Sequence, residues 1–372
     1  MRILIISKHF YPKQNPRAFR AFELAKEFAM QGHEVKVYTA TGNFDYTETE
    51  RKYGFKVANL GKMKFARVTN DGSQKIRKYH RLLNSLLGRL IHFPEIETAI
   101  KIPKLLRSEK FYDILISLAL PHPTHWGCAM AFRKNRMLAK TWIADCGDPL
   151  TGNKFSNYPF YFRYVENWVF NIADYITVPI KEALDAYDTS LHHKIRVIPQ
   201  GFKFDNVRTS AVRNDEPTFA FAGAFYENKR DPREFLDYLL TLKTKFKFIV
   251  YTNNDSLLYQ YKTLLSEKLV IRKYIERSLL LEELCKMDFL INFENLHTEQ
   301  SPSKLIDYAI TNRPILSVPS KHINKRIIDE FLVGDYTNGL KIDNIEIYKI
   351  ENVVSKFIEL HLNNSKSLDL NS

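Results

Sequence analysis

Short apolar runs alternate with longer amphipathic segments along the whole chain. Six runs in the first part have the length of buried strands, at 2–7, 34–40, 113–117, 141–145, 174–178 and 195–199. After the first run, a helical pattern stops at Gly32; its apolar positions are Ala18, Phe22, Ala25 and Ala29. Strands that alternate with helices in this way predict a parallel sheet that is covered on both faces.

The same alternation restarts after about residue 205. The polar segment 205–217 is expected to link two domains, and five apolar runs follow it, at 218–223, 246–252, 268–272, 288–293 and 314–318. The sequence therefore predicts an α/β protein with two doubly wound, Rossmann-like domains facing a cleft, over 1–204 and 205–344. The remainder, 345–372, predicts a closing helix over 345–362 that packs back on the N-terminal domain, followed by a loose tail.

Length and composition limit the class of protein. A chain of 372 residues fits two domains, and 45% hydrophobic with 26% charged residues is typical of a soluble globular protein. We expect no membrane span, because no apolar run reaches about 18 residues, and no signal peptide, because the opening apolar run is too short. Three cysteines without C-x-x-C spacing argue against a disulfide framework or a zinc site and fit a reducing cytoplasm.

The formal net charge of +13 calls for an anionic partner. A nucleic acid, an acidic membrane surface and a phosphate-bearing substrate all remain open on this ground, as does charge that only keeps the protein soluble. Residues 75–110 hold nine Lys and Arg against three Glu, with leucines interleaved. This basic amphipathic pattern suits the headgroups of an anionic membrane. A domain helix with a solvated basic face explains it equally well.

The segment HTEQSPSKLIDYAITNRPIL, residues 297–316, carries candidate chemistry. Ser301 is a good N-cap and Pro302 suits the first helical position, so a helix is expected to begin here. Backbone amides near Ser303 and Lys304, together with the helix dipole and the lysine charge, predict a phosphate site.

Two carboxylates flank this helix start, Glu299 and Asp307. Because carboxylates repel a phosphate, we expect both to accept hydrogen bonds from sugar hydroxyls instead. Phosphate and hydroxyl groups in one ligand describe a nucleotide-sugar. A well-capped helix with two surface acids is the alternative.

The spacing in this segment resembles the donor-site motif of family 4, retaining glycosyltransferases with the GT-B fold. That motif has glutamate at both ends, and Asp307 is one methylene shorter. The resemblance implies that Glu299 acts in catalysis by contacting the donor sugar and that Asp307 contacts the ribose.

Other stretches of the N-terminal half resemble the same family in order. Residues 9–40 resemble its opening strand, acceptor loop and helix, with Asn15-Pro16-Arg17 in place of the usual paired glycines. Asn15 and Arg17 are therefore acceptor-loop candidates, and Arg17 is expected near an anionic group. His125 lies in a loop that contacts the donor sugar in the family, which makes it a second catalytic candidate, although most lone histidines are structural. Gly147 replaces the arginine of a D-x-R-D-P loop.

Residues 221–232 resemble the loop that grips the donor diphosphate in the family. Ala224 replaces the arginine of that loop, whereas Lys229 keeps its lysine position and Arg230 stands beside it. A diphosphate leaving group needs cations nearby when no metal is present. We therefore expect Lys229 and Arg230 to bind the diphosphate together with Ser303 and Lys304.

These observations favour a retaining, hexosyltransferase-like enzyme that needs neither metal nor cofactor. It would move a sugar from a UDP-, GDP- or similar nucleotide-sugar to a lipid-linked or polysaccharide acceptor, as in lipopolysaccharide or capsule synthesis. We expect it in the cytoplasm, peripherally at the inner face of the membrane, with residues 75–110 on the anionic lipid surface.

Four alternatives compete with this interpretation. A nucleotide-sugar epimerase shares the architecture but would need further acid and base residues. A nicotinamide enzyme is disfavoured because the first loops lack G-x-G-x-x-G. A nucleic-acid-binding protein fits the charge, but no recognised module is present, so no nucleic acid partner is expected. A non-catalytic transferase used as a scaffold fits the losses at Ala224 and Gly147.

Overall fold

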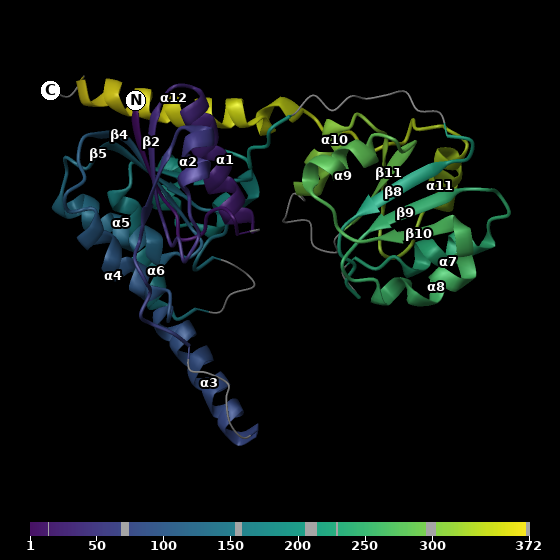
Figure 1. Ribbon diagram of the computed structural model, residues 1–372, viewed down its shortest axis with the longest axis horizontal. Coiled ribbons are helices and arrows are strands. Elements are labelled where there is room, and N and C mark those ends of the chain that lie inside the picture. The colour runs from purple at the N-terminus through teal and green to yellow at the C-terminus, as the bar shows by residue number, and fades with distance from the viewer. Residues whose placement is uncertain are drawn as a thin grey trace. The chain divides into compact units, whose positions relative to one another are not determined.

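The computed structural model describes residues 1–13, 15–67, 74–152, 158–204, 214–227, 230–294 and 303–369. The chain divides into two compact units, drawn in Figure 1. The first unit comprises Met1–Lys203 and Ile347–Ser372, and the second comprises Phe204–Glu346. Each unit is built around its own parallel sheet.

The first unit contains a seven-stranded sheet in the order β3-β2-β1-β4-β5-β6-β7, and every neighbouring pair is parallel. Its strands are β1 Arg2–Ile6, β2 Glu34–Thr39, β3 Lys56–Asn59, β4 Tyr112–Leu118, β5 Ala139–Asp145, β6 Tyr175–Val178 and β7 Ile195–Val197. Six of the seven were predicted. The apolar pattern missed β3, because this edge strand reads KVAN and buries none of its four residues fully.

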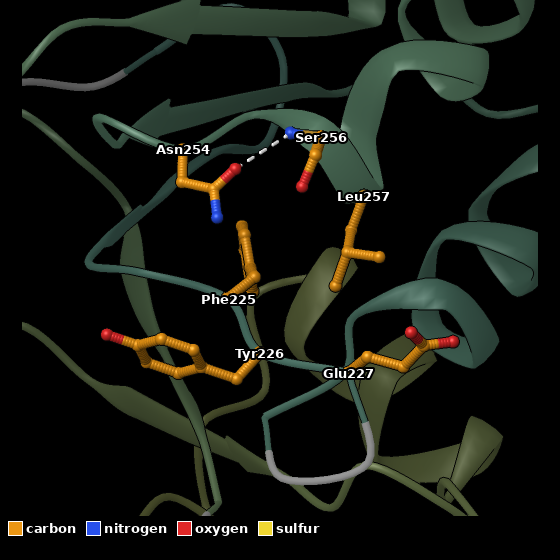
Figure 2. A pocket seen from close by; sticks show the side chains of 6 residues that line it. All are labelled: Phe225, Tyr226, Glu227, Asn254, Ser256 and Leu257. Atoms are coloured by element: carbon orange, nitrogen blue, oxygen red, sulfur yellow. Dashed lines mark hydrogen bonds between the residues drawn. The ribbon is translucent and has the colours of Figure 1, made fainter. Parts of the chain in front are cut away.

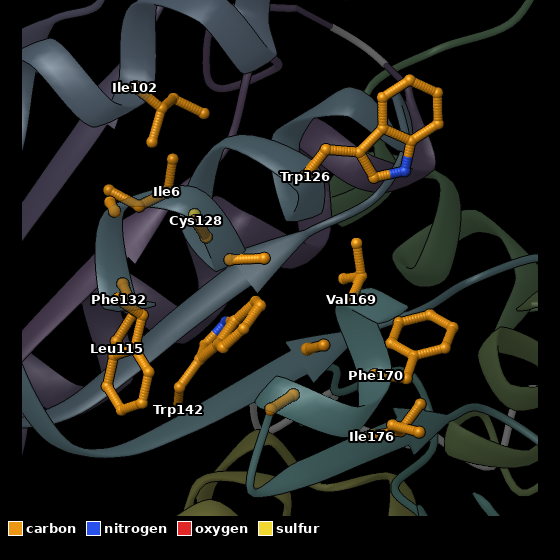
Figure 3. Close-up of a cluster of buried hydrophobic side chains, with 14 of the residues drawn as sticks. Ile6, Ile102, Leu115, Trp126, Cys128, Phe132, Trp142, Val169, Phe170 and Ile176 are labelled. Atoms are coloured by element: carbon orange, nitrogen blue, oxygen red, sulfur yellow. The ribbon is translucent and has the colours of Figure 1, made fainter. Parts of the chain in front are cut away.

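Helices cover both faces of this sheet. The helices of this unit, of which α3 extends away from the sheet, are α1 Pro16–Met30, α2 Thr47–Tyr53, α3 Gln74–Ile91, α4 Ile96–Leu105, α5 Pro123–Lys134, α6 Tyr161–Ile172 and α12 Ile350–Asp369, with 3-10 turns η1 Lys181–Ala186, η2 Thr189–Lys194 and η5 Ile345–Tyr348. Successive residues of β1 face opposite sides, as expected of a strand. Ile3 and Ile5 pack in the cluster that includes α1 and α12, whereas Leu4 and Ile6 pack in the cluster with α4, α5 and α6, shown in Figure 3.

The ends of α1 follow from its sequence. Asn15 caps the helix, because its side chain accepts a hydrogen bond from the Ala18 N–H at 2.9 Å, and Pro16 occupies the first position. At the other end Gly32 has a φ of +83°, and its N–H donates to the Ala29 carbonyl at 2.9 Å. The helix stop expected at Gly32 is therefore confirmed.

The C-terminal helix is longer than the sequence suggested. We expected a helix over 345–362 and then a loose tail, but α12 continues to Asp369 and its preceding turn is the separate η5. The prediction of a tail directly after 362 was wrong, because residues 363–369 contain no proline or glycine to end the helix. The helix packs on the first unit, where His361 Nδ1 lies 2.9 Å from the Thr141 hydroxyl and Phe357 meets Phe28 with ring centroids 6.4 Å apart.

The second unit has a five-stranded parallel sheet in the order β10-β9-β8-β11-β12. Its strands, all predicted, are β8 Thr218–Ala222, β9 Lys247–Tyr251, β10 Leu269–Arg272, β11 Phe289–Phe293 and β12 Ile315–Val318. The helices are α7 Arg233–Thr241, α8 Tyr259–Leu265, α9 Arg277–Leu284, α10 Ser303–Ile310 and α11 Lys325–Leu332, with 3-10 turns η3 Ser256–Leu258 and η4 Ser266–Lys268. Phe219 and Phe221 enter one core cluster and Ala220 and Ala222 the other.

Both sheets share one strand order, in which the connections reverse direction beside the first strand. The reversal falls between β1 and β4 in the first unit and between β8 and β11 in the second. This confirms the predicted class of two doubly wound α/β domains. Ligands of such sheets bind beyond the carboxyl ends of the strands at the reversal, so each unit has one edge where a site is expected.

Candidate functional site

At the carboxyl edge of the first sheet, a buried ion pair fixes α1 to β5. Arg20 Nε and Nη2 donate to the two carboxylate oxygens of Asp145, each at 2.6 Å, and Thr177 Oγ1 donates to the same carboxylate at 2.7 Å. Arg20 also donates to the backbone carbonyls of Ile198 and Pro199. Burial alone would raise the pKa of Asp145, but the charge and hydrogen bonds of Arg20 outweigh it and lower that pKa.

The two acceptor-loop candidates have different surroundings. Asn15 uses its side-chain oxygen to cap α1. Arg17 reaches the loop after β5, where its guanidinium carbon lies 1.8 Å from the position that a Cβ on Gly147 would take. The guanidinium therefore lies directly against the backbone of Gly147.

His125 is buried on α5, beneath this edge. Its Nδ1 lies 2.7 Å from the Ser117 hydroxyl and its Nε2 lies 3.4 Å from the Cys146 sulfur. Burial lowers the pKa of His125 to about 4, although the Asp145 carboxylate opposes the shift. Both ring nitrogens of a neutral imidazole thus face protein groups, as in a structural histidine, and its role in catalysis stays a prediction.

In the second unit, the loop after β8 forms a tight hairpin around the predicted diphosphate residues. The backbone N–H groups of Tyr226 and Arg230 each donate to the other's carbonyl, at 3.1 and 2.9 Å. Lys229 lies outside the described residues. The Arg230 guanidinium donates to the Ala224 carbonyl at 3.4 Å, so this cation lies back over the start of its own loop.

The acids of the proposed donor motif are described only in part. Glu299, the expected N-cap Ser301 and Pro302 lie outside the described residues. Ser303 and Lys304 open α10, but their side chains are also outside the described part. Asp307 Oδ1 accepts a hydrogen bond from Arg277 Nε at 2.9 Å and lies 2.7 Å from Arg277 Nη2. Arg277 opens α9 and was missed, because a single basic residue in the segment YIERSLL carries no motif of its own.

The helix that carries Asp307 abuts the reversal point of the second sheet. The hydroxyl of its buried Tyr308 accepts a hydrogen bond of 2.8 Å from the Ala222 N–H, at the end of β8. Burial raises the pKa of Tyr274. The charge of Arg230 lowers this pKa, and the charge of Asp307 raises it further. Arg230 and Asp307 thus both lie close enough to Tyr274 to affect its pKa.

A hollow of about 360 Å³ lies at the same edge, beside the hairpin after β8, as Figure 2 shows. Its lining comes from the loops after β8 and β9 and comprises Phe225, Tyr226, Glu227, Asn254, Ser256 and Leu257. Asn254 is held in place because its side-chain oxygen accepts the Ser256 N–H at 3.2 Å. The volume lies within the range of about 300–1,000 Å³ that is common for small-ligand pockets.

Helix α3 presents an apolar stripe to solvent and extends from the body of the first unit (Figure 1). Ile91, 46% exposed, ends the helix outside this stripe, which consists of four exposed apolar residues, Tyr79, Leu82, Leu86 and Leu90, with 63%, 68%, 49% and 38% of their surface accessible. At 3.6 residues per turn they fall within an arc of about 80°. Two basic residues, Lys78 and Arg89, lie within about 40° of one border of this arc, and Arg81 lies farther round the helix on the same side.

The described residues lack two features, a membrane-spanning helix and a cluster of metal ligands. No helix in the ranges that the structure describes is both long and apolar enough to cross a membrane. Within the same ranges, no group of three or more His, Cys, Asp or Glu side chains is arranged to hold a metal ion.

Solved structures resemble this fold over its whole length. The lipopolysaccharide outer core galactosyltransferase WaaB matches with a TM-score of 0.53, 12% identity, and coverage of 100% of this chain and 99% of that one. HepE of Anabaena in complex with UDP-glucose matches with a TM-score of 0.56, 10% identity and 99% of each chain. TarM of S. aureus, bound to UDP and glycan ligands, matches with a TM-score of 0.53, 13% identity, and 98% and 95% coverage.

Sequence comparison adds no relative, since no protein-family model and no curated protein matches this chain. At such low identity the structural likeness establishes the fold, which is the GT-B fold of glycosyltransferases.

Proposed function

We propose that the protein is a retaining glycosyltransferase that uses a nucleoside diphosphate sugar as donor. The observation that carries this proposal is the position of Asp307. The GT-B fold puts the helix bearing this carboxylate against the end of β8, beside the Arg230 hairpin. A hydroxyl-binding acid next to phosphate-binding groups suits one ligand that contains both, and HepE, which shares the fold, was solved with UDP-glucose.

We assign the donor to the second unit and the acceptor to the first. In the second unit, Lys229, Arg230 and the start of α10 at Ser303 and Lys304 would hold the diphosphate, and Glu299 would contact the sugar. Asp307 would accept the ribose hydroxyls. Arg277 holds this short carboxylate in place through its 2.9 Å hydrogen bond, which supports the assignment despite the missing methylene.

In the proposed reaction, the bond between the anomeric carbon and the diphosphate oxygen breaks. The acceptor hydroxyl oxygen bonds to the same face of that carbon, and its proton passes to the departing phosphate. Cations aimed at the developing charge lower the barrier of such a step. Lys229 and Arg230 would supply them, without a requirement for a metal ion.

The acceptor is proposed to be a lipid-linked glycan or polysaccharide at an anionic membrane. Helix α3 supports this view, because its exposed leucines are suited to the acyl boundary and its bordering cations to acidic headgroups. The protein would then work as a peripheral enzyme at the cytoplasmic leaflet. WaaB, which shares the fold, is described as a lipopolysaccharide core transferase.

A nucleotide screen tests the donor assignment directly. We expect one of UDP, GDP, ADP or CDP to raise the unfolding temperature of the full-length protein, and its sugars to be hydrolysed or transferred. Glu299→Ala should abolish transfer without a change in unfolding temperature, whereas the matched control Glu267→Ala, an exposed acid on η4, should keep full activity. Absence of binding by all four nucleotides would refute the proposal. Donor isomerisation without acceptor would identify an epimerase instead.

A further inference from the structure

Two arginines in the first turns of α1 have opposite environments. Arg20 is buried and uses its guanidinium on Asp145 and two backbone carbonyls. Arg17 is half-buried, and no residue in the described part of the chain forms an ion pair or hydrogen bond with its guanidinium. A partly desolvated cation without a counterion is costly, so the fold is expected to keep it only where a ligand supplies the negative charge.

The backbone of Gly147 keeps the position of this guanidinium open. A Cβ on Gly147 would stand 1.8 Å from Arg17 Cζ, 1.9 Å from Nη2 and 2.1 Å from Nη1. Any other side chain at this position would displace the guanidinium. The loop after β5 therefore lacks a side chain where α1 supplies a cation.

The neighbouring charges do not neutralise Arg17. Burial lowers the pKa of Arg17, and the carboxylates of Asp145 and Asp148 only oppose that shift. Asp145 is already engaged by Arg20 and Thr177. The charge of Arg20 acts against these two carboxylates, and Arg17 has no paired acid among the described residues.

Two further groups at this edge suit an anion. In the first turn of α1, the N–H groups of Ala18 and Phe19 both donate to Asn15, and Pro16 has no N–H. The Arg17 backbone N–H forms no hydrogen bond with another described residue, so it is available to a ligand. His122, on the loop after β4, is buried, and its pKa is lowered well below its usual value by burial and by nearby positive charge that includes Arg17. A neutral imidazole adds a hydrogen-bonding group without a competing charge.

We propose that Arg17 binds a phosphate group of the acceptor at the carboxyl edge of the first sheet. This inference rests on the proposed function, which assigns the acceptor to the first unit. The planar guanidinium and the adjacent amide match the several oxygens of a phosphate. A phosphate dianion also competes with the nearby Asp148 for Arg17 better than a carboxylate ligand does, because the phosphate carries two charges.

The test titrates inorganic pyrophosphate into the full-length protein by calorimetry, with UDP at saturation to occupy a donor site. We expect Arg17→Ala to weaken pyrophosphate binding roughly 10- to 100-fold, the usual effect of removing a hydrogen-bonded charge. Gly147→Ala should weaken it similarly, because the new Cβ overlaps the guanidinium. The double variant Arg17→Ala/Gly147→Arg should recover affinity, because it returns a guanidinium to the same loop.

Each contrary outcome has a distinct meaning. Undetectable pyrophosphate binding to the wild type, or equal affinity in Arg17→Ala, overturns the inference. Equal competition by glucuronate would make the site a carboxylate site and overturn its assignment to phosphate. Weaker UDP binding in Arg17→Ala would assign the arginine to the donor. Failure of the proposed function is separate from these results, because it appears as absence of nucleotide binding in the wild type.

Discussion

The buried pair of Arg20 and Asp145 gives the sharpest prediction about stability. Both side chains are almost inaccessible, at 4% and 2% of their surface, and the carboxylate depends on Arg20 for two of its three hydrogen bonds. Arg20→Leu leaves a buried charge that only Thr177 contacts. Removing one partner of a buried pair costs about 3–5 kcal/mol, so the first unit should melt roughly 6–20 °C lower, at about 2–4 °C per kcal/mol.

Scanning calorimetry at neutral pH measures this effect, and a double variant tests its cause. Arg20→Leu/Asp145→Leu replaces both charges by apolar groups and should be more stable than Arg20→Leu alone, since no charge is left unpaired. Arg163→Leu is the matched control; it removes an exposed arginine whose ion pair with Asp188 spans 2.8 Å, and the melting temperature should change little. A loss below about 1 kcal/mol in Arg20→Leu, or additive losses in the double variant, would refute the reasoning.

The pH dependence provides a second check on the same pair. The pKa of Asp145 is lowered in the folded state, so the pair contributes stability above the ordinary aspartate pKa of about 3.9. This contribution is lost as the pH falls through the folded-state pKa. The difference in unfolding free energy between the wild type and Asp145→Asn should therefore shrink below about pH 4.

Three further predictions concern other parts of the first unit. Because the pKa of His125 falls from 6.5 to about 4 on folding, the unfolded state binds its proton more readily, so stability should fall as the pH drops between these values. His125→Gln should remove about 3 kcal/mol of that dependence in urea unfolding across this range. Leu82→Asn with Leu86→Asn should weaken co-sedimentation with anionic vesicles at least about tenfold without loss of stability, whereas the equally exposed Met137→Asn should not. Gly127→Ala should cost about 1–3 kcal/mol, because its Cβ would stand 2.8 Å from that of Ile102, while Gly88→Ala, with 3.6 Å to its nearest neighbour, should be tolerated.

The spacing of apolar residues along the sequence was enough to predict the fold class, but not every helix and strand. Runs such as 2–7 and 288–293 read as strands because they are buried on both faces and therefore almost wholly apolar. Strand β3 gives no such signal, because an edge strand with a half-exposed surface has no need for an apolar run. The end of α12 is also hard to predict, because the polar residues 363–369 fit a solvated helix as well as a tail.

The sites were harder to predict, because their chemistry depends on contacts between distant segments. The sequence singled out Arg17 and Gly147 separately, but only the folded chain brings them together. The Arg20–Asp145 pair joins residues 125 positions apart, and Arg277–Asp307 joins residues 30 apart. No local motif encodes such pairs, so a single sequence gives no means to find them.

The return of α12 to the first unit has a consequence for synthesis on the ribosome. Its buried residues, among them Val353, Val354 and Phe357, complete the core cluster that begins with Ile3 and Ile5. The second unit is a continuous segment, Phe204–Glu346, and emerges before that helix does. The nascent chain can thus finish the second unit while the first still exposes an apolar surface on α1. The unit whose translation begins first is therefore the last to become complete.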